Sequence, residues 1–234
     1  MGETLSLGQP SFNRSVRVES RPERVSSDAG FLLGADALHA SGIIDALSER
    51  LHDPRRQDRV EYDLATLLRS FVLMVVQGWG DQSDVERLRR DPLLAIASSQ
   101  ARGQAAAGQA LASQPTFARF LDLLARPANQ SAINTAAMTL AGQRLRATNG
   151  GQRLRRLTIN VDGLPLVARG EQPGSAPNCH VGERVQYPLV GSCAETGDLL
   201  GALLRVGNTG RTEGVADLGS ELIAQARAEL ADEV

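Results

Sequence analysis

In the first 150 residues, apolar side chains recur every three to four positions, which is the period of an amphipathic helix. The widest apolar face lies between Glu61 and Trp79, where Gly78 and Gly80 mark the end of the pattern. Shorter patterns surround it. Together they predict a front region that is all-helical, with helices at 34–51, 61–79, 113–126 and 130–148 and a broken helix between 83 and 97.

Three segments of this region carry local signals of their own. Ser83 and Glu86 have the spacing of a capping box, and Asp91-Pro92 predicts a break followed by a new helix. Residues 1–30 are polar and Ser-rich with several arginines, so we expect them to be extended or poorly ordered. Residues 103–112 are of low complexity and are expected to form a loop.

After Arg156 the hydrophobic period changes from nearly four to two, and β-branched residues appear. The stretch from Leu157 to Thr209 predicts three strands, and 195–198 reads as the turn of a hairpin between the last two. Residues 212–234 return to the helical period. The sequence therefore predicts an α+β protein, with a helical front followed by three antiparallel strands and a helix.

Asp162 ends the apolar run LTINV in the first of these strands. A carboxylate there needs a cation, a hydrogen-bond network or solvent, because burial without a partner is costly. One interpretation is a strand-end Asp that faces water. The other is a ligand for Mg²⁺, a cation that prefers carboxylate oxygens. A pair of ions that clamps a phosphoryl transfer would require further carboxylates from elsewhere in the fold.

Charge adds candidate nucleic-acid contacts. The 25 basic residues are all Arg, which fits either a coding bias or bidentate phosphate binding. Residues 1–156 have a net charge of +4 and residues 157–234 a net charge of −6. Acidic residues interleave the arginines at 87–90, which favours a solvated helix face there. The better candidates for DNA contact are Arg119, on a helix that could belong to a helix-turn-helix, and the cluster Arg144, Arg146, Arg153, Arg155 and Arg156.

Compartment signals are few. Cys179 and Cys193 are the only cysteines, which favours a reducing environment over a disulfide framework. The amino terminus lacks the apolar core of a signal peptide, and the longest apolar run, at 71–76, is too short to span a membrane. We therefore expect a cytoplasmic protein.

Three segments together resemble the bacterial insertion-sequence transposases of the DDE group 1 class. They are QGWGDQSDVERLRRDPLLAIA (77–97), LASQPTFARFLDLL (111–124), and the stretch that runs from LTINVDGLPLVARGEQPG through YPLVGSCAETGDLLGALLRVGNT. The resemblance covers roughly residues 15–234 and includes an Arg-x-Gly-Asn turn. It implies cut-and-paste DNA transposition by an RNase H-like core, in which an Asp-Asp-Glu triad holds two divalent ions, Mg²⁺ or Mn²⁺. Asp162 matches the first Asp of that triad.

The second Asp and the Glu of the triad have no match in this sequence. The resemblance thus implies an amino-terminal portion of a transposase, inactive alone, with metal expected only in a complete core. It predicts a basic arm at 1–30, a helical DNA-binding and assembly region at 31–152, and the first part of the catalytic domain at 153–234. Expected partners are double-stranded DNA at terminal inverted repeats and a second copy of the chain, since an incomplete sheet leaves an open edge. The alternatives are a non-catalytic DNA-binding regulator and a helical protein-interaction module.

Overall fold

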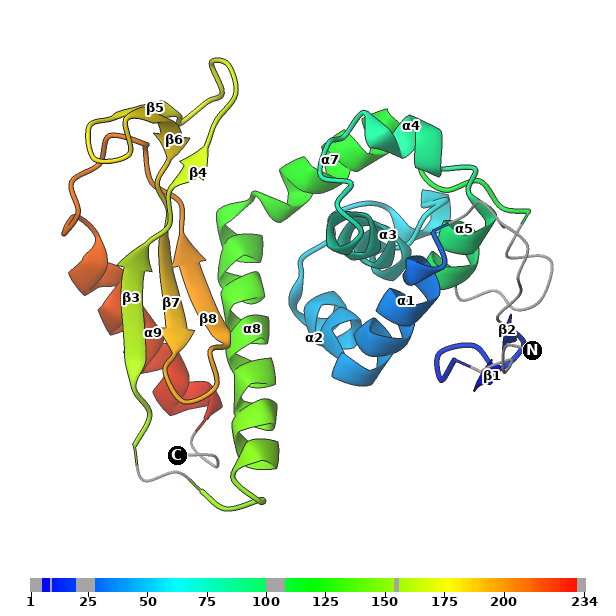
Figure 1. Ribbon diagram of the computed structural model, residues 1–234, viewed down its shortest axis with the longest axis horizontal. Coiled ribbons are helices and arrows are strands. Elements are labelled where there is room, and N and C mark those ends of the chain that lie inside the picture. Colours follow the sequence, from blue (N-terminus) through cyan, green and yellow to red (C-terminus); the bar gives the residue numbers. More distant parts are fainter. Residues whose placement is uncertain (1–5, 9, 20–27, 100–107, 154–155, 231–234) are drawn as a thin grey trace, which may run out of the picture. The chain divides into compact units, whose positions relative to one another are not determined.

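The computed structural model describes residues 6–8, 10–19, 28–99, 108–153 and 156–230. The chain divides into two compact units, residues 1–130 and 131–234 (Figure 1). The front half is helical, and two small antiparallel sheets and a C-terminal helix follow it. This confirms the predicted α+β class. The three-part division of the chain at residues 30 and 152 stays a prediction.

The first unit is built from short helices. A short β-pair, β1 (Ser6–Gly8) with β2 (Val18–Glu19), precedes them. The bounds of the helices are α1 Gly30–Ser41, α2 Ile43–Arg50, the 3-10 helix Gln57–Arg59, α3 Leu64–Val76, α4 Asp84–Leu88, α5 Pro92–Ser98 and α7 Gln114–Leu124. Phe31, Leu67 and Leu94 are at most 1% exposed and fill the centre between α1, α3 and α5. Phe120 of α7 meets Phe71 and Phe117 edge to face, each with ring centroids 6.1 Å apart.

Two local predictions in this unit are wrong. The helix expected at 34–51 is two helices, because Gly42 adopts the left-handed conformation (φ 66°) and ends α1. The Ser83–Glu86 capping box does not form. Asp81 accepts the N–H of Ser83 instead, at 2.7 Å. Glu86 accepts the N–H of Gln114 at 2.9 Å and so caps α7, a helix 28 residues further along the chain.

The second unit contains a three-stranded antiparallel sheet in the order β3-β7-β8. Its strands are β3 Ile159–Gly163, β7 Leu189–Cys193 and β8 Leu199–Leu203. Asp162 pairs with Val190, which pairs in turn with Ala202. These are the three strands that the sequence predicts, with the hairpin turn at 195–198.

A second sheet, which the sequence did not predict, extends the hairpin beyond β3 and β7. Its order is β4-β6-β5, with β4 Leu166–Val167, β5 Ala176–Asn178 and β6 Glu183–Gln186. These strands are two to four residues long, too short for a period-two pattern to stand out. The backbone at Gly207 passes close to this second sheet: a Cβ there would lie 1.8 Å from the carbonyl oxygen of Val185.

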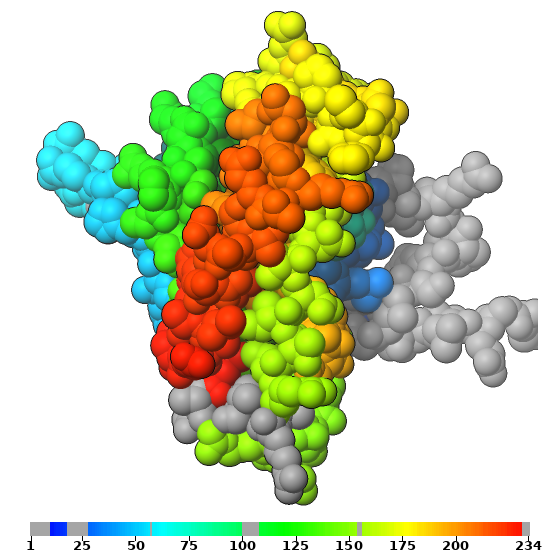
Figure 2. All heavy atoms as spheres, turned by 90° about the vertical axis from the view of Figure 1, so that its left-hand side faces the viewer, coloured from blue at the N-terminus to red at the C-terminus, as the bar shows by residue number. Residues whose placement is uncertain are grey.

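Two helices cover one face of the three-stranded sheet, namely α8 (Pro127–Thr148) and α9 (Val215–Glu229). The shared core contains Met138, Ala141 and Leu145 of α8, Leu189, Cys193 and Leu200 of the sheet, and Leu218 and Leu222 of α9. Figure 2 shows the outward surface of α9 in orange to red, with the second sheet in yellow projecting beyond it. Helix α8 also holds β8 through Asn134, whose side chain accepts the N–H of Ala202 at 3.1 Å and donates to its carbonyl at 3.3 Å.

No single helix in the described ranges is long and apolar enough to cross a membrane. Helices α1 and α2 meet that test of length and composition only as a pair, and they are bent by 62° where they join.

We predict that Gly207→Ala destabilises the second unit by about 1–3 kcal/mol, because the new methyl group collides with backbone atoms that cannot move independently. The matched control is Gly210→Ala, where a Cβ has no neighbour within 4 Å. The measurement is urea unfolding of both variants followed by far-UV circular dichroism. Equal unfolding midpoints for the two variants would contradict the close crossing.

Candidate functional site

Asp162 lies on the face of the three-stranded sheet opposite to the helices. Side chains alternate along β3, so Ile159 and Val161 point into the core while Asn160 and Asp162 are exposed. The carboxylate of Asp162 accepts the N–H of Gly163 at 2.7 Å, and no ion pair of Asp162 is found among the described residues. A carboxylate in this position has oxygen lone pairs available for a cation.

The other carboxylates of the sheet are used to hold the hairpin together. Glu195 accepts the N–H of Thr158 at 2.9 Å and the thiol of Cys193 at 3.3 Å. Burial alone would raise the pKa of Glu195, but these hydrogen bonds and one from its own backbone lower that pKa overall. Both Glu195 and Asp198 follow β7 at the end of the sheet away from Asp162, since Cys193 pairs with Ile159.

The arrangement of the acidic, His and Cys side chains limits where a metal could bind. Within the part of the chain that the structure describes, no three His, Cys, Asp or Glu side chains lie close enough together to hold a metal ion. Asp162 therefore supplies one oxygen ligand, and a two-ion site would need donors beyond those grouped here. The described residues alone do not fit a complete metal centre.

The arginines predicted to contact DNA fall in both units. Arg119 lies on α7 and lines a groove of about 300 Å³ in the first unit, together with Arg55, Arg126 and Asp122. Arg55 is bound to Asp53 at 2.7 Å, whereas Arg119 donates to the hydroxyl of Thr116 at 3.4 Å. Arg126 is exposed. The groove therefore presents two arginines, Arg119 on α7 and Arg126 in the turn that follows it, and of these only Arg119 was predicted to contact DNA.

The second set of predicted arginines lies at the end of α8 and in the loop that follows. Arg144 forms an ion pair with Asp198 at 2.9 Å while its side chain stays 63% exposed, so it also anchors α8 to the β7–β8 turn. Arg146, Arg153 and Arg156 are exposed. Arg155 lies outside the described residues.

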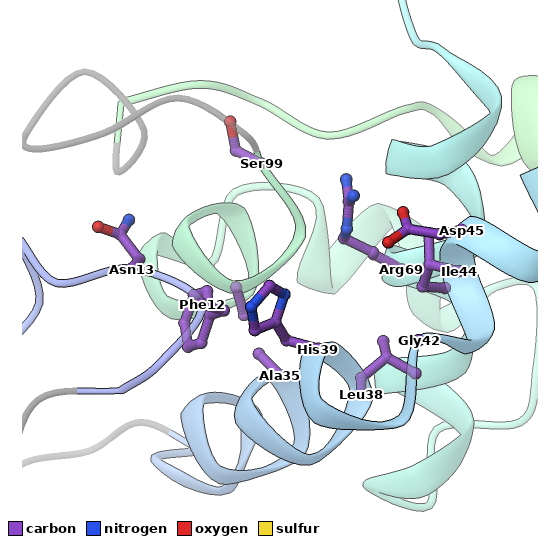
Figure 3. Close-up of a pocket in the computed structure, with 11 residues that line it drawn as sticks. Phe12, Asn13, Ala35, Leu38, His39, Gly42, Ile44, Asp45, Arg69 and Ser99 are labelled. Carbon is purple, nitrogen blue, oxygen red and sulfur yellow. The ribbon is translucent and has the colours of Figure 1, made fainter. Parts of the chain in front are cut away.

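A cavity of about 270 Å³ lies in the first unit, between the ends of α1 and α2 and the N-terminal segment (Figure 3). Phe12 and Asn13 form one wall, and His39, Asp45 and Arg69 line the other sides. The Nη1 atom of Arg69 is buried there without a hydrogen-bond partner in the described ranges. The wall is fixed by Ser11, whose backbone N–H and hydroxyl both donate to Asp36 of α1. Those two bonds lower the pKa of Asp36.

A comparison with known protein families identifies the family of this chain. The model for transposase DDE domain group 1 matches residues 8–233. The chain belongs to the transposase DDE domain group 1 family. Comparisons with curated proteins and with solved structures gave no significant match.

Membership confirms the resemblance that the sequence motifs suggested. Membership in a transposase family implies DNA binding, and the family is typically metal-dependent. The Arg-x-Gly-Asn turn of the resemblance is Arg205-Val206-Gly207-Asn208. Arg205 is only 8% exposed, and the sequence reasoning did not select it as a site residue. The sequence signal for Arg205 was its place as the first residue of the Arg-x-Gly-Asn motif.

We predict that Ser11→Ala returns the pKa of Asp36 toward the ordinary value of 3.8. The hydroxyl donor is lost, and the backbone N–H of residue 11 is then held less firmly against the carboxylate. A carboxyl group with a lowered pKa stabilises the folded state above its unfolded pKa, and that contribution disappears as pH falls through the lowered value. Docking of the segment should therefore weaken below about pH 4 in the wild type. Carboxyl-detected NMR titration of Asp36 checks this. An unchanged pKa in the variant would contradict the Ser11 contact.

Proposed function

We propose that this chain forms part of a DDE transposase that cuts and joins DNA at the ends of an insertion sequence, with Asp162 as one of its metal ligands. The observation that carries the proposal is the position of Asp162. It is an exposed carboxylate on the first strand of the sheet in a chain that belongs to a DDE transposase family. Glu195 and Asp198, the acidic residues beside the β7–β8 turn, have structural partners instead.

The topology of the second unit supports an RNase H-like core. Three neighbouring antiparallel strands of one sheet, β3, β7 and β8, are followed by α9, which packs against all three. Helix α9 covers the face opposite to Asp162, so the face that bears the carboxylate remains accessible. A reacting phosphodiester needs that access.

The metal would supply Lewis-acid stabilisation of a phosphodiester under attack. Asp162 is the described residue that would hold it. What the chain itself provides is a fixed direction for the carboxylate, because Asp162 is paired within the sheet and its Oδ1 is bound to the next N–H. The remaining donors are not assigned.

We predict that Asp162→Asn, introduced into a transposase that joins this chain to the remaining triad carboxylates, lowers Mg²⁺-dependent strand cleavage by about a thousandfold or more, because several kcal/mol of metal-assisted stabilisation disappears. Affinity for DNA without metal should stay within about twofold, since no phosphate-binding arginine changes. The measurement is cleavage of a duplex that carries the terminal inverted repeat. The matched control is Asp217→Asn on the exposed side of α9. Undiminished cleavage by the Asp162 variant would sink the assignment.

A second candidate function, a DNA-binding regulator without catalysis, is favoured by the groove beside α7. Arg119 lines it from α7, Arg126 from the turn after that helix, and Thr116 adds a hydroxyl. A phosphate backbone is recognised by this combination of guanidinium and hydroxyl donors. Salt-dependent DNA binding by the wild-type chain, with no Mg²⁺-dependent cleavage even when the chain is joined to the remaining triad carboxylates, would favour this function over the first.

For the groove we predict that Arg119→Ala and Arg126→Ala each reduce the slope of log K against log salt by about 0.9, the value for one phosphate contact in B-DNA. Arg59→Ala is the control of equal charge change, because Arg59 lies at 4.0 Å from Asp58 and does not line the groove. Fluorescence anisotropy at several salt concentrations gives the slopes. Equal slopes for all three variants would show that α7 does not contact phosphates.

A further inference from the structure

Arg205 occupies the point where three segments of the second unit meet. Its Nε donates to the carbonyl of Tyr187 at 3.0 Å, while its Nη1 donates to the carbonyls of Gly210 at 3.1 Å and Glu213 at 2.6 Å. Its guanidinium carbon lies 5.0 Å from the centroid of the Tyr187 ring. A planar guanidinium that both stacks on a ring and donates in three directions restricts that ring far more than a lysine would.

The Tyr187 ring in turn lies against the backbone of Gly163. A Cβ at position 163 would come within 2.7 Å of the ring carbon Cζ and of the hydroxyl oxygen of Tyr187, so only glycine leaves room for them. Gly163 pairs with Leu189 in the sheet, two residues after Tyr187. The ring is therefore held between the Arg205 guanidinium and the peptide that follows Asp162.

That peptide carries the N–H that binds the carboxylate of Asp162 at 2.7 Å. A continuous set of contacts thus leads from Arg205 through Tyr187 and Gly163 to Asp162. We propose that Arg205 is a positioning residue that fixes, through the Tyr187 ring, the orientation of the Asp162 carboxylate. The contacts exist whether or not Asp162 holds a metal. The proposal rests on the proposed function only in that an oriented carboxylate would serve to bind that metal.

The test reads the Gly163 amide directly, by ¹⁵N-edited NMR of the full chain at one neutral pH. In the wild type the Gly163 amide proton should lie downfield of its unfolded position and exchange slowly, because the Asp162 carboxylate accepts that N–H. In Arg205→Met and in Tyr187→Leu, we expect this downfield displacement to fall by at least half. Hydrogen exchange at Gly163 should accelerate by about tenfold. Tyr187→Phe keeps the ring and should restore both readouts to wild-type values.

The control is Arg184→Met, because Arg184 also binds a loop carbonyl, that of Ser175 at 2.9 Å, without contacting Tyr187. A role in overall stability alone would lower the melting temperature of both arginine variants and leave the Gly163 amide shift and exchange rate unchanged, which would overturn the proposal. If Arg205→Met fails to fold, the comparison of Tyr187→Leu with Tyr187→Phe decides the matter by itself. Wild-type behaviour of Tyr187→Leu would likewise overturn it.

The outcome is separable from that of the proposed function. Undiminished cleavage by Asp162→Asn would remove the metal ligand from the site but would leave the Gly163 readouts as predicted. Loss of the Arg205 effect with cleavage still dependent on Asp162 would leave the function standing and remove only the positioning role.

Discussion

The second unit depends on the close approach of α9 to the sheet, which two glycines make possible. A Cβ on Gly191 would lie 2.1 Å from Leu222, and one on Gly201 would lie 2.9 Å from the same side chain. Leu222 is fully buried at this point, between the middle strand and the edge strand. Because interiors are close-packed, larger side chains in β7 and β8 would displace the helix from the sheet. Helix α9 packs against β3 as well, so its close approach also supports the strand that carries Asp162.

Packing on one face leaves the opposite face to carry chemistry. With α8 and α9 both on the core side, Asn160 and Asp162 of β3 remain exposed on the other. The edge strand β8 is also protected, because the Asn134 side chain satisfies both backbone groups of Ala202. An edge with unpaired backbone groups tends to recruit another strand, so this amide contact removes one site of unwanted pairing.

Much of this architecture could be predicted from hydrophobic periodicity. Helix α3, the strands β3, β7 and β8, and α9 each have a strong pattern, and each appears within a few residues of the expected place. The misses have local physical causes. Gly42 breaks a helical pattern through a backbone angle that periodicity does not register. Glu86 lies at capping-box spacing, yet it binds Gln114, a contact that exists only after tertiary folding.

The candidate site shows the same limit. Asp162 could be selected from the sequence because an acidic residue in an apolar strand is unusual. The roles of Arg205 and Tyr187 come instead from their contact with each other, which only the folded structure shows. Acidic residues also divide by partner: Asp198 is bound to Arg144, and Glu195 to the Thr158 backbone. Removal of either partner would loosen the hairpin. Among the described residues, the carboxylate of Asp162 makes no such structural bond beyond its neighbouring N–H, which leaves its second oxygen accessible to a ligand.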